Sequence, residues 1–329
     1  MFSFNSIYLC HMLDYSLLKK LCSIPATAGD EQSMVQFILE YVMDNREDWE
    51  SQPAIFTGEG FQDAVILAFG RPKLAIFAHI DSVGYCTAYG NRLIKIGGPK
   101  AKDGAKLVGR DKDGDIEAIL RIKEEVDEKD KDGKKKEIFE YESDREIELG
   151  IPLTYKQEWI ENDESVQSCY LDNRLGVWNV LQLCPNLSDT AIVFTTYEEH
   201  GGGTAQFAGR FLFKSFGCRT ALISDVTLIS DGIKHGDGVA ISMRDRGIPR
   251  QAFVRQIRRI ADQQSIQYQL EVEDAGGSDG TQLQLSPYPW DWCFIGPPEA
   301  NYHTPEEKVY KYDIEQTLDL YKALCRDLM

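Results

Sequence analysis

The pattern of apolar and polar positions changes period along the chain, and each period predicts a different kind of element. Apolar residues at helical spacing predict amphipathic helices over residues 30–45, 171–184, 250–263 and 313–328. Short apolar runs bounded by turn residues predict buried strands over residues 62–70, 73–79, 190–197, 219–224 and 292–296. Because strands and helices alternate along the chain, we predict an α/β fold with a mixed, mostly parallel sheet flanked by helices.

Three details of this pattern make sharper predictions. Asp30 and Asp313 stand at the start of helical patterns, where an acidic side chain commonly caps the first turn. Segment 266–273 alternates between apolar and polar residues, as a half-buried strand does. We therefore expect its apolar side chains to face the core, and these are Ile266, Tyr268, Leu270 and Val272.

The character of the chain changes between about residues 84 and 164. Short strand patterns broken by glycine and Asp-Gly turns come first, and the nearly all-charged stretch 123–148 follows them. We predict a small β-rich, barrel-like domain here, inserted into a catalytic domain that residues 1–83 and 165–329 form together. The pattern gives the charged stretch no function.

Composition and charge narrow the classes of partner. The chain has 329 residues and a net charge of −17, so neither nucleic acid nor an anionic membrane surface is an expected partner. It contains no apolar run of about 18–20 residues, the length that a membrane-spanning helix needs. Its eight cysteines include no C-x-x-C pair and do not suggest a disulfide framework, which favours a reducing, cytoplasmic location.

The N-terminal region does not resemble a signal peptide. It is mildly apolar, but His11 and Asp14 interrupt it and no basic segment precedes it. Either Met1 or Met12 is the start of the protein, with residues 1–11 an extension in the second case.

Candidate metal-binding side chains gather at the ends of the predicted strands. Ligands of open α/β sheets bind at the carboxyl ends of the strands. The acidic and imidazole groups expected at or near that edge are His79, Asp81, Asp172, Glu198, Glu199, Asp225 and His303. Each alone is more often a structural residue, a helix cap or a surface charge. Together they form a mixed set that suits zinc and related ions, and the number of ligands favours two metals that share a carboxylate.

Adjacent glutamates occur three times, so the pairing alone carries no functional information. The pairs are Glu124–Glu125, Glu198–Glu199 and Glu306–Glu307. The first pair lies in the charged stretch, where solvated side chains are the ordinary case, and the last follows the ligand candidate His303 in a proline turn. Only the middle pair is expected at the end of a buried strand, on the edge where the other groups gather. The remaining histidines, His11, His200 and His235, are not assigned as ligands.

Five short motifs in this order resemble the M42 metallopeptidases, the glutamyl aminopeptidase or TET type of co-catalytic zinc peptidase. They are HIDSVG (79–84), LDNRLG (171–176), YEEHGGG (197–203), ISDVT (223–227) and NYHTPEE (301–307). The resemblance covers most of the chain and implies a zinc-peptidase core with an inserted β domain, residues 84–164, that serves assembly or substrate access. It also implies five metal ligands: Asp172 bridges two metals, His79 and Asp225 complete one site, and Glu199 and His303 complete the other.

The resemblance gives roles to three further features. It implies that Glu198 is the general base, that Asp81 orients His79, and that the loop 276–279 lies near the substrate pocket. Successive residues at the end of a strand point to different sides. Glu199 can therefore bind metal while its neighbour Glu198 transfers protons.

The activity implied is that of an aminopeptidase that hydrolyses N-terminal residues from peptides through a water bridged by two metals. Zinc is the expected metal, with cobalt or manganese as substitutes, and the expected assembly is a homo-oligomer, from dimer to dodecamer. A glucanase-like glycoside hydrolase would also use paired carboxylates, but it would not need His79, Asp225 and His303. A small-molecule deacylase or a non-catalytic metal-binding assembly protein would also account for the ligand residues.

Overall fold

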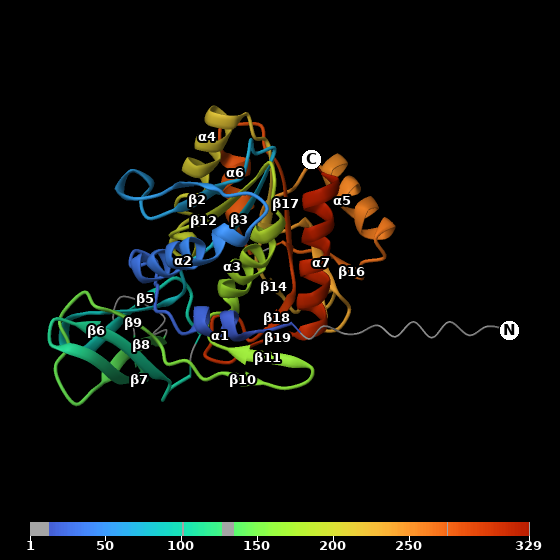
Figure 1. The fold of residues 1–329 in the computed structure, drawn as a ribbon. Coiled ribbons are helices and arrows are strands. Elements are labelled where there is room, and N and C mark those ends of the chain that lie inside the picture. The colour runs from blue at the N-terminus through green and yellow to red at the C-terminus, as the bar shows by residue number, and fades with distance from the viewer. Residues whose placement is uncertain (1–12, 101, 127–134, 275, 329) are drawn as a thin grey trace.

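A computed structural model describes residues 13–100, 102–126, 135–274 and 276–328 (Figure 1). The proposed second start position, Met12, and the middle of the charged stretch 123–148 lie outside these residues. The described part contains no helix whose length and apolar character would let it cross a membrane. All seven cysteines in this part are free thiols.

An eight-stranded mixed sheet forms the centre of the molecule. In spatial order its strands are β1 (Ala54–Phe56), β2 (Val65–Ala68), β12 (Thr190–Thr195), β3 (Leu74–His79), β13 (Thr220–Ser224), β17 (Asp291–Gly296), β15 (Val239–Arg244) and β16 (Tyr268–Val272). The four strands from β12 to β17 run parallel, and β15 is parallel to β16, whereas the remaining pairs are antiparallel. The predicted α/β fold with a mixed sheet is confirmed.

Helices cover both faces of this sheet (Figure 1). They are α1 (Ser16–Cys22), α2 (Gln32–Asn45), α3 (Leu171–Leu183), α4 (Ala205–Phe216), α5 (Gln251–Gln263), α6 (Asp279–Leu285) and α7 (Lys311–Asp327). Alternate side chains of β3 enter two different cores, since Ile76 belongs to a core that includes residues of α1, α2, α3, α5 and α7, and Phe77 belongs to one that includes residues of α4 and α6. Covering both faces explains why the central strands are almost continuously apolar.

The two predicted helix caps are wrong. Helix α2 begins after Glu31, and α7 begins after Tyr310, and neither helix has a side-chain cap. Asp313 lies inside the first turn of α7, where its carboxylate accepts hydrogen bonds from the backbone N–H groups of Gly236 (2.8 Å) and Gly238 (2.9 Å). The Asp313 carboxylate therefore binds backbone N–H groups of the loop at residues 236–238, and not those of its own helix start.

The predicted orientation of segment 266–273 is wrong for its second half. Leu270 and Val272 are 37% and 66% exposed, whereas Glu271 is buried. Strand β16 lies at the edge of the sheet and pairs only with β15, so its far side lacks the cover that a central strand receives. Glu271 points inward instead, where the hydroxyl of Thr227 donates a hydrogen bond to it.

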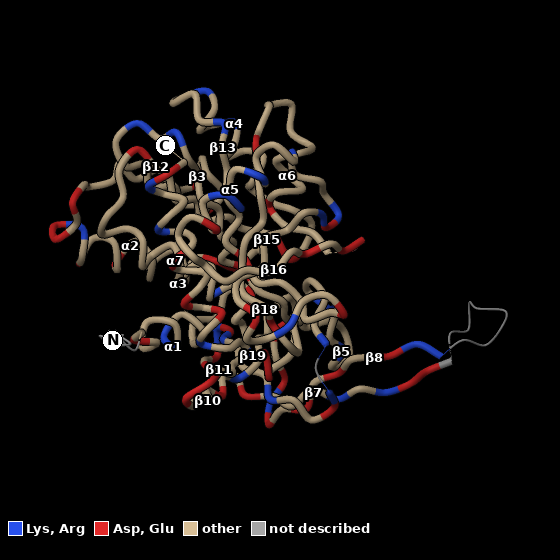
Figure 2. The backbone as a smooth tube through the Cα atoms, turned by 90° about the vertical axis from the view of Figure 1, so that its right-hand side faces the viewer, with Lys and Arg blue, Asp and Glu red and all other residues tan. Residues whose placement is uncertain are grey.

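A closed six-stranded barrel follows β3 (Figure 1). Around the barrel its strands are β4 (Gly84–Thr87), β5 (Arg92–Ile96), β8 (Lys135–Glu142), β7 (Gly114–Val126), β6 (Lys106–Asp111) and β9 (Pro152–Tyr155). The barrel has its own apolar core, which includes Tyr85, Leu120 and Tyr155. Strands β7 and β8 extend outward as a ribbon of alternating charges, with ion pairs such as that of Lys123 and Glu140 (Figure 2). The division of the chain into two domains stays a prediction.

A second, five-stranded sheet helps to position the candidate site. Its strands, in order, are β10 (Ile160–Glu161), β11 (Ser165–Ser168), β19 (Glu307–Tyr310), β18 (Pro298–Ala300) and β14 (Thr227–Leu228). Strand β11 ends shortly before Asp172, β14 begins just after Asp225, and the β18–β19 connection carries His303. Three of the predicted ligands are therefore placed by the ends of this small sheet.

Candidate metal centre

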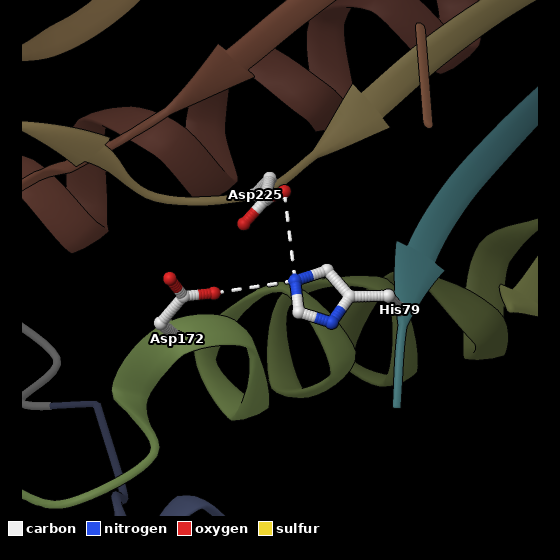
Figure 3. Close-up of side chains that lie close together, drawn as sticks. All are labelled: His79, Asp172 and Asp225. Carbon is white, nitrogen blue, oxygen red and sulfur yellow. Dashed lines mark ion pairs between the residues drawn. The ribbon is translucent and has the colours of Figure 1, made fainter. Parts of the chain in front are cut away.

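His79 lies at the carboxyl end of β3 and forms the first of two groups of potential metal ligands. Its Nε2 is 3.2 Å from Asp172 Oδ1 and 3.7 Å from Asp225 Oδ2 (Figure 3). One ligand atom from each of the three residues lies within 4.8 Å of the others. Since β13 ends one residue before Asp225 and lies next to β3 in the sheet, parallel pairing accounts for the approach of His79 and Asp225.

A second group shares Asp172 with the first. His303 Nε2 is 3.4 Å from Asp172 Oδ2 and 3.2 Å from Glu199 Oε2, and the ligand atoms of these three residues also lie within 4.8 Å of one another. Asp172 therefore presents one carboxylate oxygen to each histidine. Both groups consist of one imidazole and two carboxylates, so the five predicted ligands come together as two sets joined at one residue.

Left-handed backbone conformations shape the segments that carry these side chains. Tyr170, Tyr197 and His303 have φ values of 66°, 63° and 62°, a region that residues with a β-carbon seldom occupy. Tyr170 precedes the start of α3, and Asp172 itself has non-helical φ and ψ angles within that first turn. Such conformations persist when surrounding contacts hold them, and they are common at functional sites.

Asp81 is completely buried and fixes the turn that carries the two glutamates. Its Oδ1 accepts a hydrogen bond from Glu198 N, and its Oδ2 accepts one from Glu199 N, both at 3.0 Å. The ring Nδ1 of His79 lies 3.2 Å from the backbone carbonyl of Asp81 and 3.4 Å from its Oδ1. These acceptors favour a proton on Nδ1, which leaves the Nε2 lone pair directed at Asp172 and Asp225.

The sequence suggested that the Glu198–Glu199 pair stands directly at the end of a strand, but the structure places it beyond that strand. Strand β12 ends at Thr195, and after Tyr197 the pair begins a short 3₁₀ turn. The turn still separates the two side chains. Glu199 lies in the second ligand group, whereas Glu198 belongs to neither group and lines the adjoining cavity. Burial raises the pKa of Glu198 well above its usual value, and the charge of Asp225 raises it further.

The cavity has a volume of about 750 Å³ and opens beside both ligand groups. Residues Gly276, Gly277 and Ser278 line its wall. Ser278 also caps α6, since its Oγ accepts a hydrogen bond from Gly280 N at 3.2 Å. The loop 276–279 therefore borders the same cavity as the candidate metal ligands.

Opposite charges dominate the electrostatics of the site. Burial alone would lower the pKa of His79, yet Asp225 and Asp172 raise it well above its usual value. Burial also opposes the charge of His303, but Asp172 and Glu199 raise its pKa to about 11. Burial and the charge of Asp172 raise the pKa of Glu199 to about 7. The crowded carboxylates thus require cations, and protons on the histidines supply positive charge in the protein alone.

The donor set fits divalent metal ions. Imidazole nitrogen and carboxylate oxygen are the ligands that zinc and its neighbours in the first transition row accept. Glu199 Oε1 is buried and has no hydrogen-bond partner within the described part of the chain, as expected for an atom placed to meet an ion. His79, Asp172 and Asp225 would hold one ion, and Asp172, Glu199 and His303 would hold the other.

Glu307 was not assigned a role from the sequence, yet it supports the candidate site. Glu307 is fully buried, and it accepts hydrogen bonds from the backbone N–H groups of Asp172 (3.2 Å) and His303 (3.0 Å). It begins β19, in which Glu307 and Val309 are buried and the residues between and after them are not. This alternation was the signal in the sequence that would have distinguished Glu307 from its exposed neighbour Glu306.

Two further buried charges were not recognised from the sequence. Glu31 is 2% exposed, and its Oε1 accepts a hydrogen bond from Tyr197 N at 3.1 Å, just before the glutamate pair. Arg174 is fully buried, and its guanidinium donates to the backbone carbonyls of Ile80 and Asp81. Charged residues such as these usually lie at the surface, so their identity does not predict burial. Their neighbours in the sequence do not predict it either, because both side chains bind backbone groups far away in the chain.

The two unassigned histidines that the structure describes lie outside both ligand groups. His200 Nδ1 accepts a hydrogen bond from Gly97 N at 3.0 Å, and His235 stacks on Tyr310 with ring centroids 4.3 Å apart. His11 lies outside the described residues.

Comparison with known proteins gives consistent likenesses. Residues 65–320 match the M42 glutamyl aminopeptidase family. The chain is 27% identical, over 94% of its length and 98% of the relative's, to an Acetivibrio thermocellus protein named "Putative aminopeptidase". An aminopeptidase from the archaeon Desulfurococcus kamchatkensis has a similar structure, with a TM-score of 0.80, 22% identity, and coverage of 95% of this chain and 94% of that one. The Pyrococcus horikoshii TET1 peptidase, which can assemble into a tetrahedron or a large octahedral shell, is similar with a TM-score of 0.76 and 20% identity. The match covers 94% of this chain and 98% of that one.

Proposed function

Because the chain belongs to the M42 glutamyl aminopeptidase family, we propose that it removes N-terminal residues from peptides with the help of two divalent metal ions. The observation that carries this proposal is the pair of ligand groups joined at Asp172. One group contains His79 and Asp225, and the other contains Glu199 and His303. A carboxylate that offers one oxygen to each group is the arrangement that a two-metal hydrolase requires.

When bound, the two ions would act as Lewis acids that lower the pKa of water and polarise the scissile carbonyl. The mixed imidazole and carboxylate donors suit zinc, and cobalt and manganese accept the same ligands. The protein's part is to fix the five ligands, and the buried hydrogen bonds of Asp81 and Glu307 do so from beneath them.

Glu198 carries the proton in the proposed reaction. It lines the cavity, lies in neither ligand group, and its backbone is fixed by Asp81. In this role the Glu198 carboxylate accepts a proton from the attacking water and then donates it to the leaving amine, so that the enzyme returns to its starting state. A group that was consumed as a ligand would not be free for this exchange.

The cavity suits the free amino end of a peptide. Acidic side chains outnumber basic ones among the residues that line it, and the acidic ones are Asp172, Glu198, Glu199, Asp225, Asp245, Glu271 and Glu273. The two ions would offset the charge of Asp172, Glu199 and Asp225, which are proposed ligands. The other four carboxyl groups still outnumber the single arginine of the lining, Arg246, and this favours an α-ammonium group over an acidic chain end. This supports removal of single N-terminal residues over cleavage inside a chain.

Assembly into a homo-oligomer and a cytoplasmic location are further parts of the proposal. The similarity to the Pyrococcus horikoshii TET1 peptidase concerns the fold of one chain, so the number of subunits is measured directly. Light scattering coupled to size-exclusion chromatography of the full chain gives that number, and a strictly monomeric protein would contradict the assembly.

The test of the proposed activity is hydrolysis of a panel of aminoacyl chromogenic substrates, each with a free and an acetylated amino group. We expect turnover of free substrates only, loss of turnover after chelation, and recovery when zinc, cobalt or manganese is added back. Hydrolysis of β-glucan that survives chelation would instead support a glycoside hydrolase. Release of acetate from the acetylated compounds, with their chromophore still attached, would support a deacylase, and metal binding without any turnover would support a non-catalytic assembly protein.

A further inference from the structure

The barrel makes three direct contacts with His303. The carbonyl oxygen of Gly98 lies 3.1 Å from the ring Nδ1 of His303. The backbone N–H of Lys100 donates to the carbonyl of His303 at 2.9 Å, and the hydroxyl of Tyr155 donates to the same carbonyl at 3.1 Å. Both the ring and the backbone of His303 are therefore held by residues of the barrel.

The backbone contacts matter because His303 has an unfavourable conformation. Its φ of 62° is left-handed, which a residue with a β-carbon adopts only when its surroundings impose it. Glu307 accepts the hydrogen bond of the His303 N–H from the catalytic core, at 3.0 Å. Lys100 and Tyr155 satisfy the carbonyl from the other side. Two different parts of the molecule thus maintain the conformation together.

The ring contact determines which nitrogen faces the metal site. A carbonyl only accepts hydrogen bonds, so its position beside Nδ1 favours the proton there and leaves the Nε2 lone pair free. Nε2 is the atom that approaches Asp172 and Glu199. A β-carbon added to Gly98 would lie 3.3 Å from Nδ1, a distance so short that the imidazole would have to move.

The contacting segment is itself anchored. Gly97 N donates a hydrogen bond to His200 Nδ1, which ties the segment to the turn that carries Glu199. Tyr155 is buried and stacks on Tyr170, with ring centroids 5.7 Å apart and an angle of 10° between the planes. The hydroxyl of Tyr170 accepts a hydrogen bond from Tyr155 N, and Tyr170 precedes Asp172 by two residues. The barrel thus contacts the turn next to Glu199 as well as the segment that leads to Asp172.

The two histidines differ in this respect. His79 is oriented by Asp81, two residues further along its own loop, so its support comes from the catalytic core. His303 depends on a part of the chain about two hundred residues earlier, in the barrel. A disturbance of the barrel contacts should therefore reach one ligand group and spare the other.

We propose that Gly98 and Tyr155 are positioning residues for His303, and that the barrel is a structural part of the second metal site. This inference rests on the proposed two-metal function. It gives the inserted barrel a role inside the catalytic centre, in addition to the assembly or access role expected from the sequence. Gly98 sets the ring, and Tyr155 sets the backbone carbonyl that fixes the loop.

The test is a calorimetric titration of zinc into the metal-free full-length protein, combined with elemental analysis of bound metal. We expect Gly98→Ala and Tyr155→Phe each to weaken one of the two zinc equivalents, that of the His303 group, roughly tenfold or more and to leave the other unchanged, as is typical when the partner of a metal ligand is altered. The melting temperature of the metal-free protein serves as a control for folding, since a general structural defect would lower it. We expect it to change little.

Two matched variants serve as controls. Tyr141→Phe removes another barrel hydroxyl, which accepts a hydrogen bond from Ile147 N at 3.3 Å and is not in contact with the site. Gly60→Ala adds a β-carbon where nothing lies within 4 Å. Both should bind two zinc ions with the affinity of the wild type.

The outcomes separate this inference from the proposed function. If the wild type binds two ions and both test variants bind both ions with unchanged affinity, the positioning role is overturned and the function stands. An equal loss in the controls would also overturn it. If the wild type binds only one ion, the two-metal function fails and this inference fails with it.

Discussion

Glu307 accepts a hydrogen bond from the backbone N–H of Asp172 at 3.2 Å, through the oxygen that it does not use for His303. One buried carboxylate thus ties the residue shared by both ligand groups to a histidine of the second group. The tie acts on backbone atoms, so it fixes the positions of the ligands without occupying any ligand atom.

Replacing Glu307 by alanine should therefore damage the site without removing a ligand. Two part-buried N–H groups lose their acceptor, at a cost of up to about 1–3 kcal/mol each. We expect bound metal and aminopeptidase activity to fall roughly 10- to 100-fold, as for other partners of metal ligands. Glu306→Ala changes the exposed neighbour and should match the wild type in both measurements. Equal metal content in Glu307→Ala and the wild type would contradict the tie.

Glu198 and Glu199 should respond differently to the same substitution. Glu198→Gln removes the group that transfers protons but no ligand, so we expect full metal content with kcat reduced by about 10²–10⁴. Glu199→Gln removes a carboxylate of the second ligand group, so we expect loss of about one metal ion per chain by elemental analysis. The two assignments would be reversed if Glu198→Gln lost metal and Glu199→Gln kept it.

The strand ends could be predicted from the sequence because local patterns determine them. Continuous apolar runs identified β3, β12 and β13, and parallel pairing then brings their ends to one edge of the sheet. His79 and Asp225 follow from this logic alone. Asp172, at the start of a helix, and His303, after the last strand of the large sheet, were candidates by their places near the same edge, and the resemblance of the motifs then gave the division of the ligands between two metals.

The supporting residues could not be predicted in the same way, because they act over long distances in the chain. Glu31 binds a backbone group at Tyr197, and Gly98 contacts His303. Neither residue is distinguished by its neighbours in the sequence. The inverted burial of β16 has a related cause, since the alternation was recognised but the partner of Glu271, Thr227, lies on another strand.

Glu31 predicts a specific dependence of stability on pH. Burial, and then the charge of Asp81, raise its pKa from 4.5 to about 7 in the folded protein. A carboxyl group with a raised folded pKa binds its proton more tightly when folded. Its contribution to stability is therefore complete below about pH 4.5 and is lost as the pH rises to about 7. The loss amounts to about 3 kcal/mol, because each pKa unit corresponds to about 1.36 kcal/mol.

The measurement is the difference in unfolding free energy between Glu31→Gln and the wild type, from urea titrations at one metal concentration. Glutamine does not ionise, so the variant should gain stability relative to the wild type between pH 5 and pH 7.5. Glu40→Gln, on the exposed face of α2, the helix that begins just after Glu31, should show no such trend. A difference in unfolding free energy that does not depend on pH would contradict the raised pKa of Glu31 in the folded protein.

Metal removal should destabilise the folded protein. The carboxylates of Asp172, Glu199 and Asp225 lie close together, and each would otherwise depend on a protonated histidine for positive charge. An ion that binds only the folded state adds about 2.7 kcal/mol of stability when its free concentration is 100 times its Kd. We therefore expect chelation to lower the melting temperature and added zinc to restore it. His303→Ala should lose part of this zinc response and keep the part due to the His79 group, whereas Asp172→Ala, which alters both groups, should lose nearly all of it.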